Sequence, residues 1–436
     1  MEIKSRQTLI LIVAIFIFAL GFGIVIPVIP FYAKNAGASA LVLGLLLAVF
    51  SFLQFFCGPF WGKISDNIGR KPVVLIGLLG FTIAFVMLGL SNNLAWVFAA
   101  EIIGGALSAG IQPAAMAFIA DITTPEERGG LMGAMGAASG VGLISGPFLS
   151  SVLSPLGLSV PFYVAAAMSF VTLLGVNILI TETRKSFEKL TVGDLLLPVF
   201  VVRMIGESLV QMVVALVTPV GIYLLATLVI SFAISGFEGT FAYYIMDTFR
   251  LTENASSVNI FYLPITITGP LVTGIVFALM GVVMVVCQGL MVGRLINRFG
   301  EELVIIGGLL VSATGLLLMV LPGKLSFVPP DLGFVVGFIC IVSVGSGLVF
   351  PSLNTIISRK TDEKDQGIVM GIMTSFGNFG RILGPPIAGF TYDVYLAIPY
   401  LLSAAIMIAT AAGVFVLAMG HQKKDQVTVA LEQIIR

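Results

Sequence analysis

Long apolar segments alternate with short polar segments along the whole chain, and this pattern predicts membrane-spanning helices. About 20 consecutive apolar residues cross the hydrocarbon core of a bilayer. By that measure we predict twelve spans, at residues 8–32, 40–61, 72–91, 94–119, 130–152, 160–181, 221–247, 271–293, 302–322, 332–356, 366–391 and 397–420. Because twelve is even, we expect both termini on the same side of the membrane.

Lysine and arginine gather on one side of these predicted spans. That side holds Lys4, Arg6, Lys63, Arg70, Lys71, Arg128, Arg184, Lys185, Lys189, Arg203, Arg294, Arg298, Arg359, Lys360, Lys364, Lys423, Lys424 and Arg436. The other side holds Lys34, Arg250 and Lys324. Since positive residues are retained in cytoplasmic loops, we predict a multi-pass plasma-membrane protein with both termini in the cytoplasm.

The composition excludes several classes of protein. Of 436 residues, 58% are hydrophobic and 10% are charged, against about 25% charged in soluble proteins. A net charge of zero argues against nucleic acid as a partner. The three cysteines lie inside apolar segments and the single histidine is His421, so we expect no metal site. No nucleotide-binding or hydrolase motif is present, so we expect neither a cofactor nor enzymatic activity.

The chain divides into two halves that resemble each other. We predict an N-terminal six-helix half at residues 1–181, a cytoplasmic linker at 182–220 and a C-terminal six-helix half at 221–436. In the linker, Arg203, Glu207 and Gln211 recur every four residues. This spacing predicts one polar stripe on a helix that lies in the membrane interface, not a thirteenth span.

An internal repeat supports this division. Asp121 to Pro147 aligns with Arg359 to Pro385, so that Gly129 matches Gly367 and Gly146-Pro147 matches Gly384-Pro385. Two six-span halves related by an axis along the membrane normal are one layout of secondary transporters, with the substrate site between the halves. We therefore predict an all-α membrane protein of twelve helices in two pseudo-symmetric halves.

The segment from Gly62 to Pro72 is rich in charge and glycine, and we predict a tight turn on the membrane surface. Its candidate gating residues are Gly62, Asp66, Gly69, Arg70 and Lys71. A modified copy runs from Gly293 to Gly300, where the acid becomes Asn297 and the two bases become Glu301-Glu302. We therefore expect a charge-based latch on the N-terminal half, although a solvated turn that only fixes topology is the simpler alternative.

Taken together, four motifs resemble the major facilitator superfamily, in particular its twelve-span drug:proton antiporters. They are the Gly62 turn, Leu20-Gly21 with Pro27-Val28-Ile29-Pro30, the antiporter-like segment with Gly142, Gly146 and Pro147, and Phe237-Glu238. The resemblance implies a proton-coupled exporter of drugs or other amphipathic small molecules that works as a monomer by alternating access. Two spans depart from the family pattern. Glu101 stands in the fourth span where relatives usually carry arginine, and Gly347 and Phe350 stand in the tenth span where some relatives carry an acid and an arginine.

Three charged residues fall well inside predicted spans, namely Glu101, Glu238 and Arg381, and Asp247 and Asp393 lie near span ends. A charge at the bilayer centre costs about 2.5 to 3.5 kcal/mol on insertion scales, so such residues are paired, face a cavity or function. The helical rise places all three about 10 to 15 Å below the outer surface. We predict proton coupling through them, with Arg381 neutralising one glutamate. Glu101 either replaces the family arginine in function or pairs with Arg381.

Small and polar residues flank these charges at helical spacing, and the candidate cavity residues are Ser108, Gln112, Ser235 and Asn378. The alternative is that these stripes are packing faces, because small residues let membrane helices approach. A permease for one metabolite is the rival function, and a membrane sensor without transport is a third. Residues 254–270, with Pro264 and Pro270, extend the approach to the eighth span, and the sequence assigns them no element.

Overall fold

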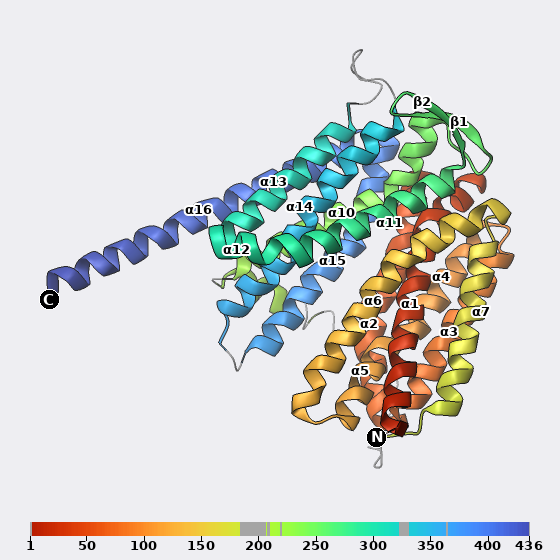
Figure 1. Cartoon of the computed structure of the whole chain (residues 1–436), viewed down its shortest axis with the longest axis horizontal. Helices are drawn as coiled ribbons and strands as arrows, with labels where there is room; N and C mark the ends of the chain where they lie inside the picture. The colour runs from red at the N-terminus through yellow and green to blue at the C-terminus, as the bar shows by residue number, and fades with distance from the viewer. Residues whose placement is uncertain are drawn as a thin grey trace.

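The computed structural model describes residues 2–183, 206, 210–218, 220–321, 331–362 and 365–435. The predicted all-α architecture is confirmed, because long helices make up nearly the whole described chain (Figure 1). Of the predicted linker, residues 184–205, 207–209 and 219 lie outside the described part. Because Arg203 and Glu207 are among these residues, the predicted interfacial stripe remains untested. Residues 210–216 are helical.

The helices of the N-terminal half run back and forth across one bundle. Their bounds are α1 Glu2–Asn35, α2 Ala40–Ile68, α3 Arg70–Leu90, α4 Leu94–Ser108, α5 Ile111–Ile122, α6 Pro125–Leu153 and α7 Val160–Leu179, with the short 3-10 turn η1 Ser154–Leu156 after α6. Helix α1 packs against α6 and α7, and α3 packs against α4 and α7. The predicted fourth span is broken at Ala109 and Gly110, where a Cβ on Gly110 would lie 2.9 Å from the Trp61 Cβ.

The C-terminal half repeats this arrangement with one added element. Its helices are α10 Gly221–Phe249, α11 Gly269–Cys287, the π-helical turn η2 Gln288–Val292, α12 Gly293–Phe299, α13 Glu301–Met319, α14 Leu332–Arg359, α15 Gln366–Val394 and α16 Ile398–Ile435. The added element is an antiparallel hairpin of β1 Ser256–Ile260 and β2 Leu263–Ile267. It occupies the segment to which the sequence assigned no element.

The two charged glycine turns are shorter than predicted. Residues 62–68 are the last turns of α2, and the chain turns at Gly69 alone, whose φ is 107°. Likewise, Gly293 to Phe299 is helix α12, and the turn falls at Gly300 with a φ of 80°. Residues other than glycine rarely adopt such φ values. A single glycine therefore makes the turn at each site, in place of the longer turn that the charge pattern suggested.

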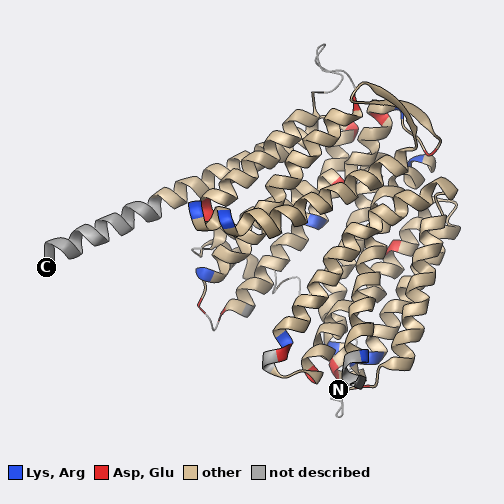
Figure 2. Ribbon diagram, in the orientation of Figure 1, with Lys and Arg blue, Asp and Glu red and all other residues tan. Residues whose placement is uncertain are grey.

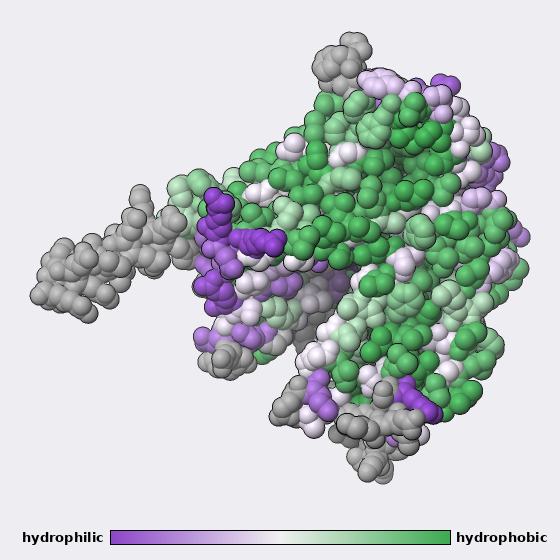
Figure 3. All heavy atoms as spheres, in the orientation of Figure 1, coloured by the Kyte–Doolittle hydropathy of each residue, from purple (hydrophilic) through white to green (hydrophobic). Residues whose placement is uncertain are grey.

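The two halves meet along two helix pairs, α2 with α15 and α6 with α11. We call the end of the bundle that carries Gly69 and Gly300 the motif end, and the end that carries β1 and β2 the hairpin end. Most charged residues lie at these two ends, and the outer surface is largely apolar (Figures 2 and 3). Among described residues, eleven helical segments are long and apolar enough to cross a membrane. The chain is a multi-pass membrane protein.

Candidate functional site

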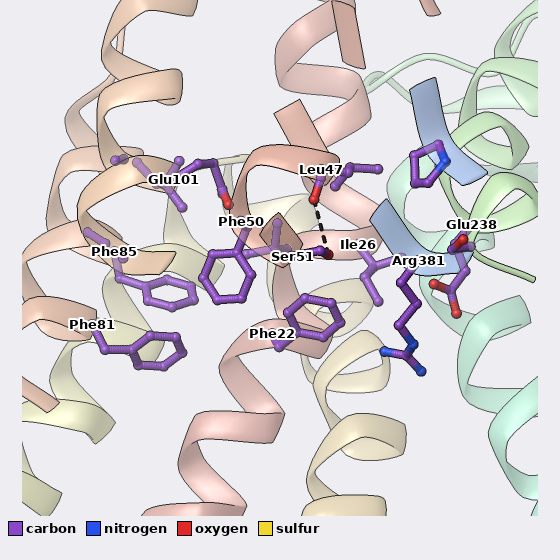
Figure 4. A pocket seen from close by; sticks show the side chains of 17 residues that line it. Phe22, Ile26, Leu47, Phe50, Ser51, Phe81, Phe85, Glu101, Glu238 and Arg381 are labelled. Carbon is purple, nitrogen blue, oxygen red and sulfur yellow. Dashed lines mark hydrogen bonds between the residues drawn. The ribbon is translucent and has the colours of Figure 1, made fainter. Parts of the chain in front are cut away.

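Between the halves lies a small pocket that contains all three membrane-embedded charged residues of the predicted site (Figure 4). Glu101 comes from α4, Glu238 from α10 and Arg381 from α15. The pocket has a volume of about 50 Å³, which is room for a few water molecules at roughly 10 to 15 Å³ each. Its walls are mostly apolar and include Phe22, Phe50, Phe81, Phe85, Ala100, Ser235 and Pro385. The pocket therefore has room for a few water molecules but not for a drug-sized molecule.

Arg381 lies on the same side of this pocket as Glu238 (Figure 4). The two charges interact electrostatically, but among the described residues neither side chain has a hydrogen bond or an ion pair within 4.0 Å. Arg381 is exposed to the open space between the halves, whereas Glu238 is half-buried. The arginine is therefore close enough to influence the charge of Glu238 without being locked to it.

Glu101 lies on the opposite side of the pocket, with Phe50 and Ser51 between it and Arg381 (Figure 4). Its exposed fraction is 5%, and no described side chain or backbone group bonds to its carboxyl group. In this conformation Glu101 therefore does not pair directly with Arg381, which was one of the two alternatives for Glu101. Hydrophobic rings fill the space that a pair would need.

A larger cavity adjoins the small pocket on the side of the motif end and is drug-sized. Its volume is about 590 Å³, within the roughly 300 to 1,000 Å³ of ligand pockets. Its lining includes Phe18, Phe22, Phe55, Gln54, Gln112, Ser139, Thr374, Ser375, Asn378 and Arg381. Figure 3 shows the surface hollowed between the halves at this level. Arg381 lines both the pocket and the cavity, so it joins the two compartments.

The predicted cavity residues separate into three groups. Gln112 and Asn378 line the large cavity, and Ser235 lines the small pocket. Ser108 is fully buried and lines neither space, because its hydroxyl donates to the Gly104 carbonyl at 2.6 Å and accepts from Gln54 Nε2 at 2.8 Å. Ser108 therefore positions Gln54, which lines the large cavity. The sequence did not predict Gln54 as a cavity residue, because phenylalanines surround it in the sequence.

The glycines of the antiporter-like motif hold two helices close together. A Cβ on Gly142 or Gly146 would overlap the carbonyl oxygens of Phe16 and Leu20, respectively, on α1. A Cβ on Gly274 of α11 would lie 2.5 Å from the Pro147 carbonyl oxygen in the other half. These contacts agree with the packing alternative for Gly142 and Gly146, and they place Pro147 at the junction of the halves.

At the hairpin end, polar bonds cross from one half to the other. The Asp393 carboxylate of α15 accepts from the Ala40 and Leu41 amides at the start of α2, both at 2.9 Å. Lys34 pairs with Asp247 at 3.2 Å, and the Tyr243 hydroxyl donates to the Ala38 carbonyl at 2.9 Å. These contacts close the hairpin end. The sequence placed both aspartates near span ends, but it could not identify their partners.

At the motif end of the N-terminal half, Arg70 is the centre of a charge network. It pairs with Asp66 at 2.6 Å and with Asp121 at 3.3 Å, and it donates to Ser65 at 2.6 Å.

The network also holds the turn at Gly69. Glu182 accepts from the Arg70 and Lys71 amides, both at 3.0 Å, and a Cβ on Gly69 would overlap this carboxylate. The Lys71 ammonium donates to the Asn177 carbonyl at 2.7 Å. Four of the five predicted gating residues, Asp66, Gly69, Arg70 and Lys71, therefore lie at this turn, with Asp121 and Glu182 as additions. Gly62 lies within α2, where its carbonyl accepts from the Ser65 hydroxyl at 2.7 Å.

The C-terminal half carries the same arrangement with its charges reversed. Glu301 follows Gly300 as Arg70 follows Gly69, and Glu301 pairs with Arg359, the repeat counterpart of Asp121. Next to it, Glu302 pairs with Lys360 at 3.2 Å and accepts from the Tyr223 hydroxyl at 2.6 Å. The sequence predicted a charge-based latch on the N-terminal half, and that stays a prediction, but the C-terminal half carries ion pairs at the corresponding place. The alignment concealed this because acids and bases exchange places.

Curated relatives match nearly the whole chain, and the chain covers nearly their whole length. The quinolone resistance protein NorA of Staphylococcus aureus (strain COL) is 27% identical over 409 residues, which covers 93% of this chain and 95% of the relative. Multidrug resistance protein 2 of Bacillus subtilis (strain 168) is 27% identical over 414 residues, with 93% and 94% covered.

Solved transporter structures share the fold. A mutant of the peptide transporter POT in complex with sulfate superposes with a TM-score of 0.73 at 13% identity, covering 95% of this chain and 94% of that one. The human organic anion transporter MFSD10 gives a TM-score of 0.60 at 22% identity, covering 94% and 99%. At these identities the likeness concerns the fold alone.

The family model that matches this chain is described as Major Facilitator Superfamily, and it matches residues 11–274 and 254–433. Those two ranges cover almost all of both halves, and they agree with the helical architecture and the cavity between the halves. The chain belongs to the Major Facilitator Superfamily and is a secondary transporter.

Proposed function

We propose that this transporter exports drugs or other amphipathic small molecules in exchange for protons. The observation that carries the proposal is the pair of adjoining compartments that share Arg381: a pocket of about 50 Å³ with two carboxylates and a cavity of about 590 Å³. The first suits a proton with a few waters, and the second suits an amphipathic compound. The relatives are named for quinolone resistance and multidrug resistance, which supports export of this class of compound.

The charges of the small pocket favour exchange. With Glu101, Glu238 and Arg381 all ionised, the region carries one excess negative charge in surroundings of low dielectric, where an unbalanced charge is costly. One proton or one monovalent organic cation would restore neutrality. Either one alone makes the net charge of the region zero, and both together would make it positive. Binding of the proton and binding of the cation therefore oppose each other, as antiport requires.

We assign proton binding to Glu238, with Arg381 as its modulator and Glu101 as a second carboxyl group. Low-dielectric surroundings favour a neutral carboxyl group, and a nearby guanidinium favours the carboxylate. Glu238 and Arg381 both lie in the C-terminal half, whereas Glu101 lies in the N-terminal half. Rocking of the halves would therefore move Glu101 relative to Glu238 and Arg381, and that change in charge surroundings would bind or release the proton. Gln112 and Asn378 would contact the substrate.

The orientation follows from the positive residues. With Lys4, Arg6, Arg70 and Lys71 at the motif end, the rule for cytoplasmic loops places that end, and both termini, in the cytoplasm. The large cavity, which adjoins the small pocket on this side, would then face the cytoplasm. It would receive substrate from inside the cell, as an exporter must.

The test is Glu238→Gln in proteoliposomes with an imposed pH gradient. We expect loss of uphill transport of a fluorescent organic cation, with downhill movement of the same compound retained, because glutamine keeps the shape but cannot exchange a proton. Asp362→Asn, which removes an exposed acid between α14 and α15, is the matched control and should leave driven transport unchanged. Unchanged uphill export by Glu238→Gln would remove this residue from coupling.

A further inference from the structure

The hairpin of β1 and β2 presents an apolar face that the protein covers only in part. Cross-strand pairs put Val258, Ile260, Leu263 and Ile265 on one face and Ser257, Asn259, Pro264 and Thr266 on the other. On the apolar face, Val258 of β1 is buried, with an exposed fraction of 7%, whereas Leu263 and Ile265 of β2 are 66% and 41% exposed. Strand β1 contacts α14, so β2 overhangs the bundle.

The tip of the hairpin adds two exposed aromatic rings to this face. Phe261 and Tyr262 are 60% and 67% exposed, and they have φ values of 49° and 66°. Bulky residues rarely adopt this left-handed conformation, which costs of order 1–3 kcal/mol at each position. The glycine or asparagine usual at a two-residue turn would avoid that cost. The aromatic residues at this turn therefore call for an explanation other than turn geometry.

One buried carboxylate fixes the height of the tip. Asp331 is 1% exposed and accepts from the Phe261 amide at 2.8 Å, the Tyr262 amide at 2.7 Å and the Gly333 amide at 2.8 Å. The last of these bonds caps the start of α14. Both tip rings also pack edge-on against Phe334 in the first turn of α14, with centroids 6.2 and 6.0 Å apart.

The hairpin therefore lies across the end of the bundle and does not project from it. Its base joins α11 at Gly269, and its tip is tied to the first turn of α14 (Figure 1). Two of the segments that are long and apolar enough to cross a membrane begin at these places, at Gly269 and Leu332. Aromatic side chains are enriched at this depth, where an apolar ring meets the headgroup layer.

We propose that the uncovered face of this hairpin, made of Phe261, Tyr262, Leu263 and Ile265, inserts into the interfacial layer of the lipid bilayer. Lipid fits this face better than a protein partner does for two reasons. The face adjoins a surface that is already embedded in the membrane. The opposite face of the same two strands carries Ser257, Asn259 and Thr266, as expected for water above it. The hairpin would then anchor the hairpin end of the C-terminal half at a fixed depth while the halves rock.

The test uses spin labels on the full chain in phospholipid nanodiscs. Single cysteines are introduced as Leu263→Cys on the apolar face and Ser257→Cys on the polar face, in a background with Cys57, Cys287 and Cys340 changed to alanine. Collision with oxygen, which concentrates in lipid, is compared with collision with a water-soluble nickel chelate. Both sites are exposed, so the fold tolerates the labels.

We expect the ratio of oxygen to nickel accessibility to be several-fold higher at position 263 than at position 257. Equal ratios, with nickel reaching both labels, would show that the face lies in water and would overturn the proposal. Protection of position 263 from both reagents would also overturn it, because a protein, such as a second copy of this chain, would then cover the face. Neither result bears on proton coupling.

Discussion

The two ends of the helix bundle use their polar side chains in opposite ways. At the hairpin end, Asp393 and Asp247 of the C-terminal half bond to residues of the N-terminal half. At the motif end, Arg70 and Arg359 bond to acids within their own halves. Bonds between halves must break when the cavity changes sides, whereas bonds within a half can persist. The structure is therefore closed at the hairpin end, where charged side chains bond from one half to the other, and open at the motif end, where they bond within one half.

Packing reinforces this difference at the hairpin end. A Cβ on Gly44 of α2 would overlap the Pro385 carbonyl oxygen on α15, and a Cβ on Gly389 of α15 would overlap the Ala40 carbonyl oxygen on α2. The two backbones thus touch directly across the junction of the halves. At Gly58, on the same helix but toward the motif end, the nearest atom to a Cβ is 3.7 Å away.

The largest expected effect comes from Gly44→Ala. The added methyl group forces α2 and α15 apart at the closed end, at about 1–3 kcal/mol, which is roughly a 5- to 150-fold shift in population toward the state open at the hairpin end. Electron-electron double resonance between labels at Leu156 and Val394 measures that opening. Gly58→Ala is the control and should not shift the distance. An unchanged distance in Gly44→Ala would mean that this contact does not hold the end closed.

A smaller effect in the same direction is expected from Asp393→Ala. The carboxylate caps α2 from the opposite half, and loss of a cap costs about 0.5–2 kcal/mol. The same pair of labels measures the resulting opening.

Ser39 supplies the matched control for the Asp393 prediction. Its hydroxyl caps the same helix from within the N-terminal half, accepting from the Val42 amide at 3.4 Å. Ser39→Ala should therefore destabilise the start of α2 without opening the hairpin end. If both variants opened it equally, helix fraying and not the bond between halves would be the cause.

The difference between the two ends also shows where sequence reasoning succeeds. Spans and the repeat are predictable because apolar length and glycine spacing act locally. The three charges in the membrane stood out because charge is costly there. The sequence did not predict the bonds from Asp393 to the Ala40 amide or from Asp331 to the hairpin tip, because both partners are backbone groups that leave no residue signal.

Two further differences between the sequence analysis and the structure have physical causes of their own. Glu101 and Arg381 lie at similar depth, so depth alone suggested a pair, but Phe50 lies between them. The charge network of the C-terminal half escaped notice because its signs are reversed: Glu301 takes the place of Arg70, and Arg359 takes the place of Asp121. When the acid and the base exchange places, the ion pair is preserved although the residue type at each position changes.

The smallest expected effect is that of Asp66→Asn at the motif end. The carboxylate is 42% exposed, and Arg70 keeps its bonds to Asp121 and Ser65 without it. A partly exposed pair contributes about 0.2–1 kcal/mol, so turnover should slow by at most about fivefold, while the dissociation constant for substrate stays unchanged. The physical reason is that Asp66 pairs with Arg70 at the motif end and does not line the cavity.

Asn297 lets the same experiment compare the two halves. It occupies the place of Asp66 in the copy with reversed charges, and it is exposed. Asn297→Ala should therefore leave turnover unchanged. Transport rate and equilibrium binding are measured on both variants. Loss of binding with normal turnover in Asp66→Asn would contradict a conformational role for the motif end. Equal slowing by Asn297→Ala would instead show that the two halves contribute alike, whatever the sign of their charges.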